Sequence, residues 1–450
     1  MYTTLIAFGW IFTALFGAMI LVPWMLGKRH LVTFWSLFLI GSINFLSLGM
    51  VQNAEGLSQL NLETETWMFV LSMFLFYGLA AAVYFRPLKR PIGASLLRYP
   101  LDTNLTIGTV AVAFAIGGII LGRLPHFPFV QFLLILNGPM SIAAFALSVL
   151  LLYRTPGSPL TWLVIGISFP LGLFNVFTYG TGRRELLALL MAIPIVAYWV
   201  HFRMRPIGRT AFALVILGSV GALAVTAYAG FRHSDRDNDS STELAINRIK
   251  RLPTAMVEVA TDFSLFGDVG SLIDGQNAVH VSLLTIQLTE TERTMERDIL
   301  ALPKFILANP IPRRFWPSKP IGLGKILPVT QGWRRVTWGP SVIGHAFYDG
   351  GWWTVVLYGL ATGWIIRWLD QVMMFDPENP WLIAMFASIS GHAIGYSRGD
   401  CGTFAINLLG SMFLLYLILN ILRILSGMRQ RPNSLSHTRS PPVAGLRWQT

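Results

Sequence analysis

Arginines that lie away from the cytoplasmic ends of apolar segments are the residues of this chain best suited to chemistry. They occur in pairs or beside glycine and proline, at Arg183, Arg184, Arg313, Arg314, Arg334, Arg335 and Arg398. A guanidinium group binds phosphate through two parallel hydrogen bonds. Cations on the translocated side of a membrane run against the usual charge bias, so their clustering there predicts an anionic ligand.

The first arginine pair stands at the start of an apolar run, in the segment Thr181-Gly-Arg-Arg-Glu-Leu-Leu. A helix N-terminus carries unsatisfied N–H groups and the positive end of the helix dipole, so Arg183 and Arg184 would strengthen an anion site. The alternative is that both side chains reach phospholipid headgroups while Glu185 compensates their charge.

A proline-rich segment, Asn309-Pro-Ile-Pro-Arg-Arg-Phe-Trp-Pro-Ser-Lys-Pro320, holds the next cations. Its four prolines exclude a regular helix and favour extended or turn conformations that project Arg313, Arg314 and Lys319. The cations would face a ligand, or they would face headgroups if the loop lies in the interface.

Tryptophans flank the third pair, because Arg334 and Arg335 lie between Trp333 and Trp338. Indole rings stack on sugars, and they also anchor proteins at the membrane interface. Ligand binding and headgroup binding therefore both remain open for this pair.

Two short segments supply groups that can transfer protons. The segment 343–351 contains His345 and Asp349, and the segment 390–400 contains His392, Arg398 and Asp400. Imidazole and carboxylate groups act as general bases, which makes these residues catalytic candidates. Each is also compatible with a structural role as a helix cap or a partner between helices.

The composition sets the elements that must position these groups. The 450 residues are 54% hydrophobic and only 12% charged, and the mean hydropathy is +0.57. These values indicate an all-α polytopic membrane protein. Runs near the ~20 residues that cross a bilayer predict eleven transmembrane helices, at residues 4–26, 31–51, 66–85, 105–122, 129–153, 160–180, 185–202, 210–230, 351–369, 380–396 and 402–425.

Several other classes of protein are excluded. The single cysteine, Cys401, permits no internal disulfide and no cysteine-based metal site. The chain has no P-loop and no HExxH or GxSxG motif. Its basic charge follows the ends of apolar runs and forms no aromatic-interleaved basic helix. We expect no metal, no cofactor and no nucleic-acid partner.

Loop charges predict that the N-terminus is outside and the C-terminus inside. With that orientation the inner segments hold sixteen Lys and Arg against four Asp and Glu. The short outer loops hold four against five, and the segment 231–350 holds fourteen against thirteen. Essentially all of the net charge of +12 then lies inside, as the positive-inside rule requires.

Four regions follow from this pattern. Residues 1–230 contain eight transmembrane helices, and residues 231–350 form one large external loop. Within that loop, residues 243–263 and 276–308 have the spacing of amphipathic helices at the outer interface. Residues 351–425 contain three more transmembrane helices, and the basic tail 426–450 is expected to be disordered at the cytoplasmic face.

Four blocks, taken in order, resemble the bacterial O-antigen polymerases, the Wzy-type polymerases of oligosaccharide repeat units. Gly182-Arg-Arg-Glu-Leu-Leu is similar to the family's Gly-Ser-Arg before a leucine-rich helix, and Ile311-Pro-Arg-Arg-Phe-Trp-Pro-Ser-Lys-Pro320 to its Pro-Arg and Lys-Pro loop. Gly344-His-Ala-Phe-Tyr-Asp-Gly-Gly351 resembles a Gly-Glu-x-Tyr block, with His345 in place of the acid, and Tyr396-Ser-Arg-Gly-Asp400 resembles a late external Arg-Gly element.

The resemblance implies a membrane glycosyltransferase with a GT-C-like architecture in the bacterial inner membrane. Its substrate would be an undecaprenyl-diphosphate-linked oligosaccharide, and its partners would be membrane lipids, a chain-length regulator and a flippase. Arg184 and Arg313 would stabilise the diphosphate, and His345, Asp349 or Asp400 would take the acceptor proton. The other cations near these blocks, with His392, would bind substrate: Arg183, Arg314, Lys319, Arg334, Arg335 and Arg398.

Two alternatives belong to other classes of membrane protein. An O-antigen ligase would share the fold and the donor but use lipid A as the acceptor. A transporter of lipid-linked sugars would show duplicated halves and charges near the bilayer midplane. The chain shows no internal repeat, and its unusual cations gather at the outer ends of the spans.

The predicted orientation has a direct test. A phosphatase or fluorescent reporter fused after Thr450 should report a cytoplasmic C-terminus, because the tail carries an excess of arginine. A fusion after Gln52 should report the outer side, because the chain has crossed the membrane twice by that point. If each fusion reported the other side of the membrane, the protein would have the opposite orientation.

Overall fold

The computed structural model describes residues 1–87, 101, 103–124, 133–178, 183–203, 208–213, 241–261, 278–309, 311–333 and 337–425. Within these residues the regular structure is entirely helical. Eight helices are long and apolar enough to cross a membrane, which agrees with a polytopic membrane protein. They span 2–25, 34–52, 63–84, 104–123, 134–154, 159–178, 185–202 and 401–421.

These eight helices coincide with eight of the eleven predicted spans. The predicted spans 351–369 and 380–396 also form helices, α19 (Trp352–Phe375) and α20 (Pro380–Gly395). Tryptophans and Arg367 lower the hydropathy of α19, and α20 is shorter than the other spans. The remaining predicted span, 210–230, lies largely outside the described residues.

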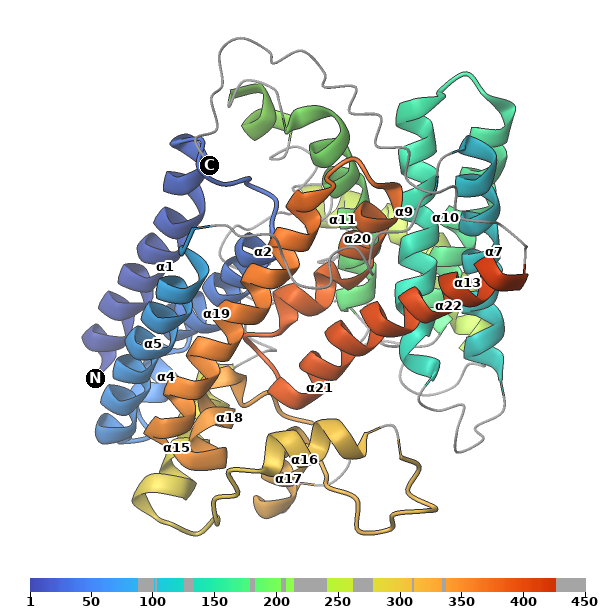
Figure 1. The fold of residues 1–450 in the computed structure, drawn as a ribbon. Coiled ribbons are helices and arrows are strands. Elements are labelled where there is room, and N and C mark those ends of the chain that lie inside the picture. Colours follow the sequence, from blue (N-terminus) through green and yellow to red (C-terminus); the bar gives the residue numbers. More distant parts are fainter. Residues whose placement is uncertain are drawn as a thin grey trace.

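The helices form two groups with a central pair between them (Figure 1). One group contains α1 (Tyr2–Met25), α2 (Phe34–Ser42), α5 (Glu63–Tyr84) and α19. The other contains α7 (Asn104–Arg123), α9 (Asn137–Arg154) and α10 (Pro159–Thr178). Helices α11 (Arg183–Ala197) and α20 join the groups, because α20 packs on α2, α9 and α11.

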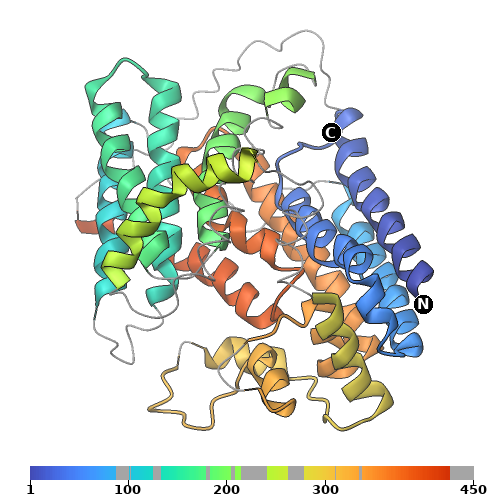
Figure 2. The ribbon, with the colours of Figure 1, turned by 180° about the vertical axis from the view of Figure 1, so that it is seen from behind.

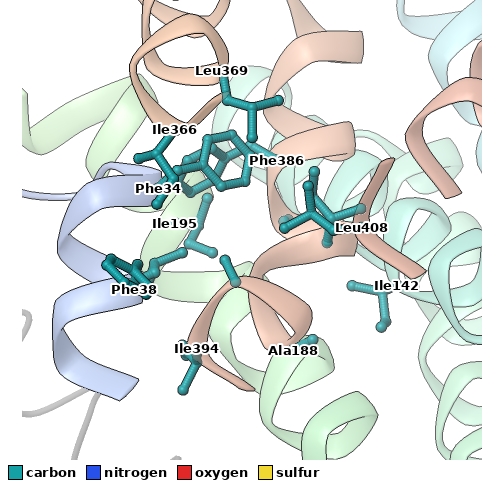
Figure 3. Close-up of a cluster of buried hydrophobic side chains, with 14 of the residues drawn as sticks. Phe34, Phe38, Ile142, Ala188, Ile195, Ile366, Leu369, Phe386, Ile394 and Leu408 are labelled. Atoms are coloured by element: carbon teal, nitrogen blue, oxygen red, sulfur yellow. The ribbon is translucent and has the colours of Figure 1, made fainter. Parts of the chain in front are cut away.

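Helix α20 is the centre of the fold, since every one of its residues is buried. Its aromatic and aliphatic side chains meet those of α2, α11 and α19 in the cluster drawn in Figure 3, where Phe34 packs on Phe386 at 4.3 Å between ring centroids. Its N-terminus is capped by the side chain of Asn379, which accepts from the amides of Trp381 and Leu382. The position of the residues that follow α20 is therefore fixed by a fully buried helix.

Helices α5 and α19 run in the same direction and pack closely. Gly359 lies against Phe76 and Gly363 against Ala80, so a Cβ added at Gly359 would stand 2.8 Å from the Phe76 carbonyl oxygen. Small residues four apart allow helix backbones to approach each other inside a membrane. The contact fixes the register of α19 along α5.

A buried carboxylate on α19 fixes the start of α2. Asp370 accepts hydrogen bonds from the amides of Phe34 and Trp35, at 2.7 and 3.2 Å, and from the Tyr84 hydroxyl at 2.9 Å. The first amides of a helix lack partners inside the helix, so this carboxylate satisfies groups that would otherwise be buried and unpaired. Three separate segments are joined at this point.

Contacts between loops join segments that the sequence predicts on the same side of the membrane. Arg203 pairs with Glu378 at 2.8 Å, which joins two predicted inner segments. Glu65 accepts a hydrogen bond from Thr291, which joins the first outer loop to the large loop. The alternation of segments between two faces is thus consistent with these contacts.

The predicted amphipathic segments of the large loop form helices with different surroundings. Helix α13 (Ser241–Thr261) forms where an amphipathic helix was predicted, is largely exposed, and packs along α10, crossing the α7–α10 group obliquely (Figure 2). Helix α15 (Ala278–Ile286) is largely buried against α5 and α18 (Ser341–Gly350). Its apolar residues therefore take part in tertiary packing.

The remaining loop elements form a small cap at the end of the bundle (Figure 1). It contains α16 (Ala301–Ala308) and α17 (Leu323–Thr330), joined by the proline-rich segment, which is not helical over its described residues. The cap faces α21 (Cys401–Ala405), which continues through Ile406–Gly410 into α22 (Ser411–Leu425). The shorter elements elsewhere are 43–47, α3 (Leu48–Gln52), α4 (Ala54–Ser58), 134–136, 198–202 and 287–291.

We expect Gly363→Leu to destabilise the protein by about 1–3 kcal/mol, because the added side chain meets the backbone of Ala80. Gly166→Leu on α10 is the matched control, since a Cβ there meets nothing within 4 Å. Thermal unfolding in detergent measures both. Equal melting temperatures for the two variants would contradict the close α5–α19 contact.

Candidate functional site

A cavity of about 630 Å³ lies between the cap and the start of α21. Its volume is within the range of small-ligand sites. Four cationic side chains from three segments line it, Arg313, Lys319, Lys325 and Arg398, together with one acid, Asp400. Trp338, Phe305 and Phe404 supply aromatic surface to the same walls.

The proline-rich segment is held in shape by its own lysine. Lys319 Nζ donates to the carbonyl oxygens of Asn309 at 2.6 Å and Ile311 at 3.1 Å. Partial burial and the nearby charge of Arg313 lower the pKa of Lys319. These bonds close the loop around Arg313, which remains exposed at the cavity wall, whereas Arg314 is exposed but does not line the cavity.

Arg398 is positioned by backbone contacts with the start of α18. The Arg398 carbonyl accepts from Ser341 N at 3.0 Å, and the Ser397 carbonyl accepts from Val342 N at 3.3 Å. The Arg398 guanidinium lies 5.9 Å from the centre of the Phe45 ring, within cation–π range. Gly339 permits this approach, because a Cβ there would stand 2.7 Å from the Arg398 carbonyl oxygen.

Asp400 connects three helices, α17, α18 and α21, through one carboxylate. Oδ1 accepts from the amides of Gly402 and Thr403 at 3.1 and 3.3 Å, which caps α21. Oδ2 accepts from Gly324 N at 3.3 Å, which attaches α17. Oδ1 also lies 3.3 Å from His345 Nε2. Burial would raise the pKa of Asp400, but His345 and these amides lower it overall.

His345 is enclosed by two carboxylates. Its Nδ1 lies 3.3 Å from Asp349 Oδ2, and its Nε2 faces Asp400. Burial alone would lower the pKa of His345, but the two acids raise it to about 10. The imidazole is therefore protonated near neutral pH and has no lone pair for a general base. Asp349 is fully buried and also accepts from the Tyr358 hydroxyl.

The proton-transfer candidates therefore differ in their access to the cavity. Asp400 lines it, whereas His345 and Asp349 lie behind Asp400. His392 is buried on α20 and its ring meets Phe404, a cavity residue, at 6.4 Å between centroids. His392 and Glu185 line a separate small pocket inside the bundle.

The side chains of the remaining arginines that the sequence identified lie outside the described part of the chain. Arg183 and Arg184 are the first residues of α11, and their side chains lie outside the described part of the chain. Glu185, in the first turn of α11, packs on Gly138, which follows the cavity residue Ile135 by three positions. Arg334 and Arg335 lie outside the described residues.

Lys325 is the cation that the sequence analysis missed. It follows a Gly-Leu-Gly stretch without a second basic residue beside it, so no pairing pattern identifies it. Helix α17 turns it into the cavity because the backbone of Gly324 bonds both to Asp400 and to Trp338 N, the latter at 2.8 Å. The only sequence feature that could have identified Lys325 as a site residue is its position just after the proline-rich segment.

The arrangement is suited to binding a polyanion beside a polar or sugar-like group. Four cations face one carboxylate that is already compensated by amides and by His345. Among the described residues no group of three or more His, Cys, Asp and Glu side chains is placed to hold a metal ion. Comparisons with protein-family models, with curated proteins and with solved structures found no match.

The buried His345 predicts a pH dependence of stability. The pKa of His345 in the folded protein, about 10, exceeds the ordinary value of 6.5. Its stabilising contribution is thus fully present below pH 6.5 and is lost as the pH rises through about 10. His345→Gln should remove this loss, so its melting temperature in detergent should fall less steeply with alkaline pH. Parallel pH profiles for the two proteins would contradict the assignment.

Proposed function

We propose that this protein is a membrane glycosyltransferase that polymerises lipid-linked oligosaccharide repeat units at the outer face of a bacterial cytoplasmic membrane. The observation that carries the proposal is the meeting of Arg313, Lys319, Lys325 and Arg398 at one cavity. The cavity lies beside the end of an apolar helix, where the headgroup of a lipid substrate would be found.

The donor in this proposal is a glycan joined to undecaprenyl diphosphate. A hydroxyl of the acceptor sugar attacks the anomeric carbon, the new C–O bond forms, and the bond to the diphosphate oxygen breaks. The lipid diphosphate leaves with the bonding electron pair. Guanidinium groups stabilise the charge that develops on its oxygens, so Arg313 and Arg398 are the proposed contacts, with Arg184 from the start of α11.

The acceptor proton needs a destination. Of the three candidate bases, Asp400 is the one that lines the cavity, while His345 carries a proton already. We assign the acceptor hydroxyl to Asp400, which would take the proton as C–O bond formation makes that hydroxyl acidic. His345 and Asp349 then act as positioning residues that hold the Asp400 carboxylate.

The proposal includes the finer features of the architecture. It requires eleven spans with the N-terminus outside and the C-terminus inside, and a GT-C-like arrangement in which the cap covers an external site. The large loop and Asp400 must then face the same outer compartment, in keeping with the contacts of α17 and α18 to residues 397–400. A flippase would supply the lipid-linked units, and a chain-length regulator would act on the product.

Arg313→Ala should reduce glycan elongation by about 100-fold or more, because it removes a cation that stabilises the leaving group. Arg313→Lys should also be poor, since lysine keeps the charge but loses the planar two-point contact. Arg314→Ala is the matched control, because Arg314 is adjacent but does not line the cavity. The measurement is the length distribution of surface glycans at equal protein levels.

The same glycan analysis separates a polymerase from a ligase. Loss of a polymerase leaves single repeat units attached to lipid A, whereas loss of a ligase leaves none. Wild-type ladders from Arg313→Ala, or equal defects in Arg313→Ala and Arg314→Ala, would contradict the role assigned to this cavity.

A further inference from the structure

Three arginines meet at the opposite end of the bundle, around the last turn of α5. Arg29 follows α1, Arg86 follows α5, and Arg367 lies on α19. Arg29 Nη2 donates to the carbonyl oxygens of Tyr84 and Arg86, both at 3.3 Å. Arg367 Nη2 donates to the carbonyl of Pro87. Both guanidinium groups thus bind the same stretch of backbone.

Local structure brings these residues together. Gly27 adopts a left-handed conformation with φ of 67°, which ends α1 and lets the Lys28 and Arg29 amides bond to the Pro23 carbonyl. The chain turns back toward α5 as a result. The close α5–α19 contact at Gly363 brings Arg367, one turn further along α19, to the end of α5.

The cluster has more donors than the protein satisfies. Arg29 Nη1 and Arg367 Nε are buried and donate to no acceptor in the described part of the chain. No ion pair joins Arg29, Arg86 or Arg367 to a carboxylate there. The nearby acid, Asp370, is occupied by the amides of α2 and by Tyr84.

Exposed apolar residues are close neighbours of these arginines along the chain. Met25 and Leu26 are 63% and 62% exposed at the end of α1, and Trp364, three residues before Arg367, is 59% exposed. Phe85 is 39% exposed beside Arg86. A free phosphate ion would use the guanidinium groups alone, whereas a phospholipid would also place acyl chains against this apolar surface.

We propose that Arg29, Arg86 and Arg367 form a binding site for the phosphate headgroup of an anionic phospholipid on the face where α1 and α5 end. This site is separate from the cavity under the cap and does not depend on the function proposed for that cavity. The ligand would accept from the unsatisfied guanidinium N–H groups and relieve the repulsion among the three cations.

The test uses the purified full-length protein in detergent and measures binding of phosphatidylglycerol by native mass spectrometry or by thermal shift. Arg86→Gln is the informative variant, because the Arg86 side chain makes no hydrogen bond or ion pair among the described residues and the backbone caps by Arg29 and Arg367 remain. Arg154→Gln, at the exposed end of α9, is the control with the same loss of charge.

We expect Arg86→Gln to weaken phosphatidylglycerol binding by about fivefold, which corresponds to the loss of one basic contact at a membrane surface. Arg154→Gln and phosphatidylcholine should show no comparable effect. An equal loss for Arg86→Gln and Arg154→Gln, or no loss for either, would overturn the site. Displacement of the lipid by a large excess of inorganic phosphate would overturn the phospholipid assignment in favour of a free anion.

Discussion

The carboxylate of Asp400 is the interaction on which the half of the molecule that contains the cap depends. It is buried, and burying a charge in a protein interior is costly unless several donors compensate it. The amides of Gly324, Gly402 and Thr403 and the protonated His345 provide that compensation. The cap, α18 and α21 therefore meet at the Asp400 carboxylate. The residues that compensate its charge also hold the cavity wall in place.

This construction explains how four cations can line the cavity with only one acid among the lining residues. Asp400 is the one acid among the lining residues, and its charge is already balanced from behind. Arg313, Lys319, Lys325 and Arg398 thus give the cavity a predominantly cationic lining. A site of this kind selects ligands by negative charge first, and Trp338 and the phenylalanines then select for shape and stacking.

The sequence predicted the fold class well, and the prediction of a helical, multi-pass membrane protein is confirmed. Apolar length alone determines this result, because a bilayer leaves the backbone few alternatives to a helix. The surroundings of α15 could not be predicted in the same way. A buried helix and an interfacial helix can share one apolar periodicity, and only the packing of α15 on α5 and α18 distinguishes them.

The candidate site was predictable in part, for a reason that its residues make clear. The sidedness of loops identifies which arginines share a face, and Arg313, Lys319 and Arg398 indeed line one cavity. The membrane side on which a loop lies carries no information on how deeply a side chain is buried or on which residues it contacts. It cannot reveal that His345 lies between two carboxylates, that Arg314 does not line the cavity, or that the isolated Lys325 does.

Helix α19 connects the two ends of the molecule and contributes a polar side chain to a buried carboxylate system at each. At one end the Tyr358 hydroxyl donates to Asp349, which faces His345 and, through it, Asp400. At the other end Asp370 binds the start of α2 and the Tyr84 hydroxyl, beside Arg29 and Arg367. Both systems need α19 in a fixed register, which Gly359 and Gly363 provide by their contact with α5. A helix that must satisfy polar groups at both ends cannot be uniformly apolar, in keeping with the absence of α19 from the eight helices that are long and apolar enough to cross a membrane.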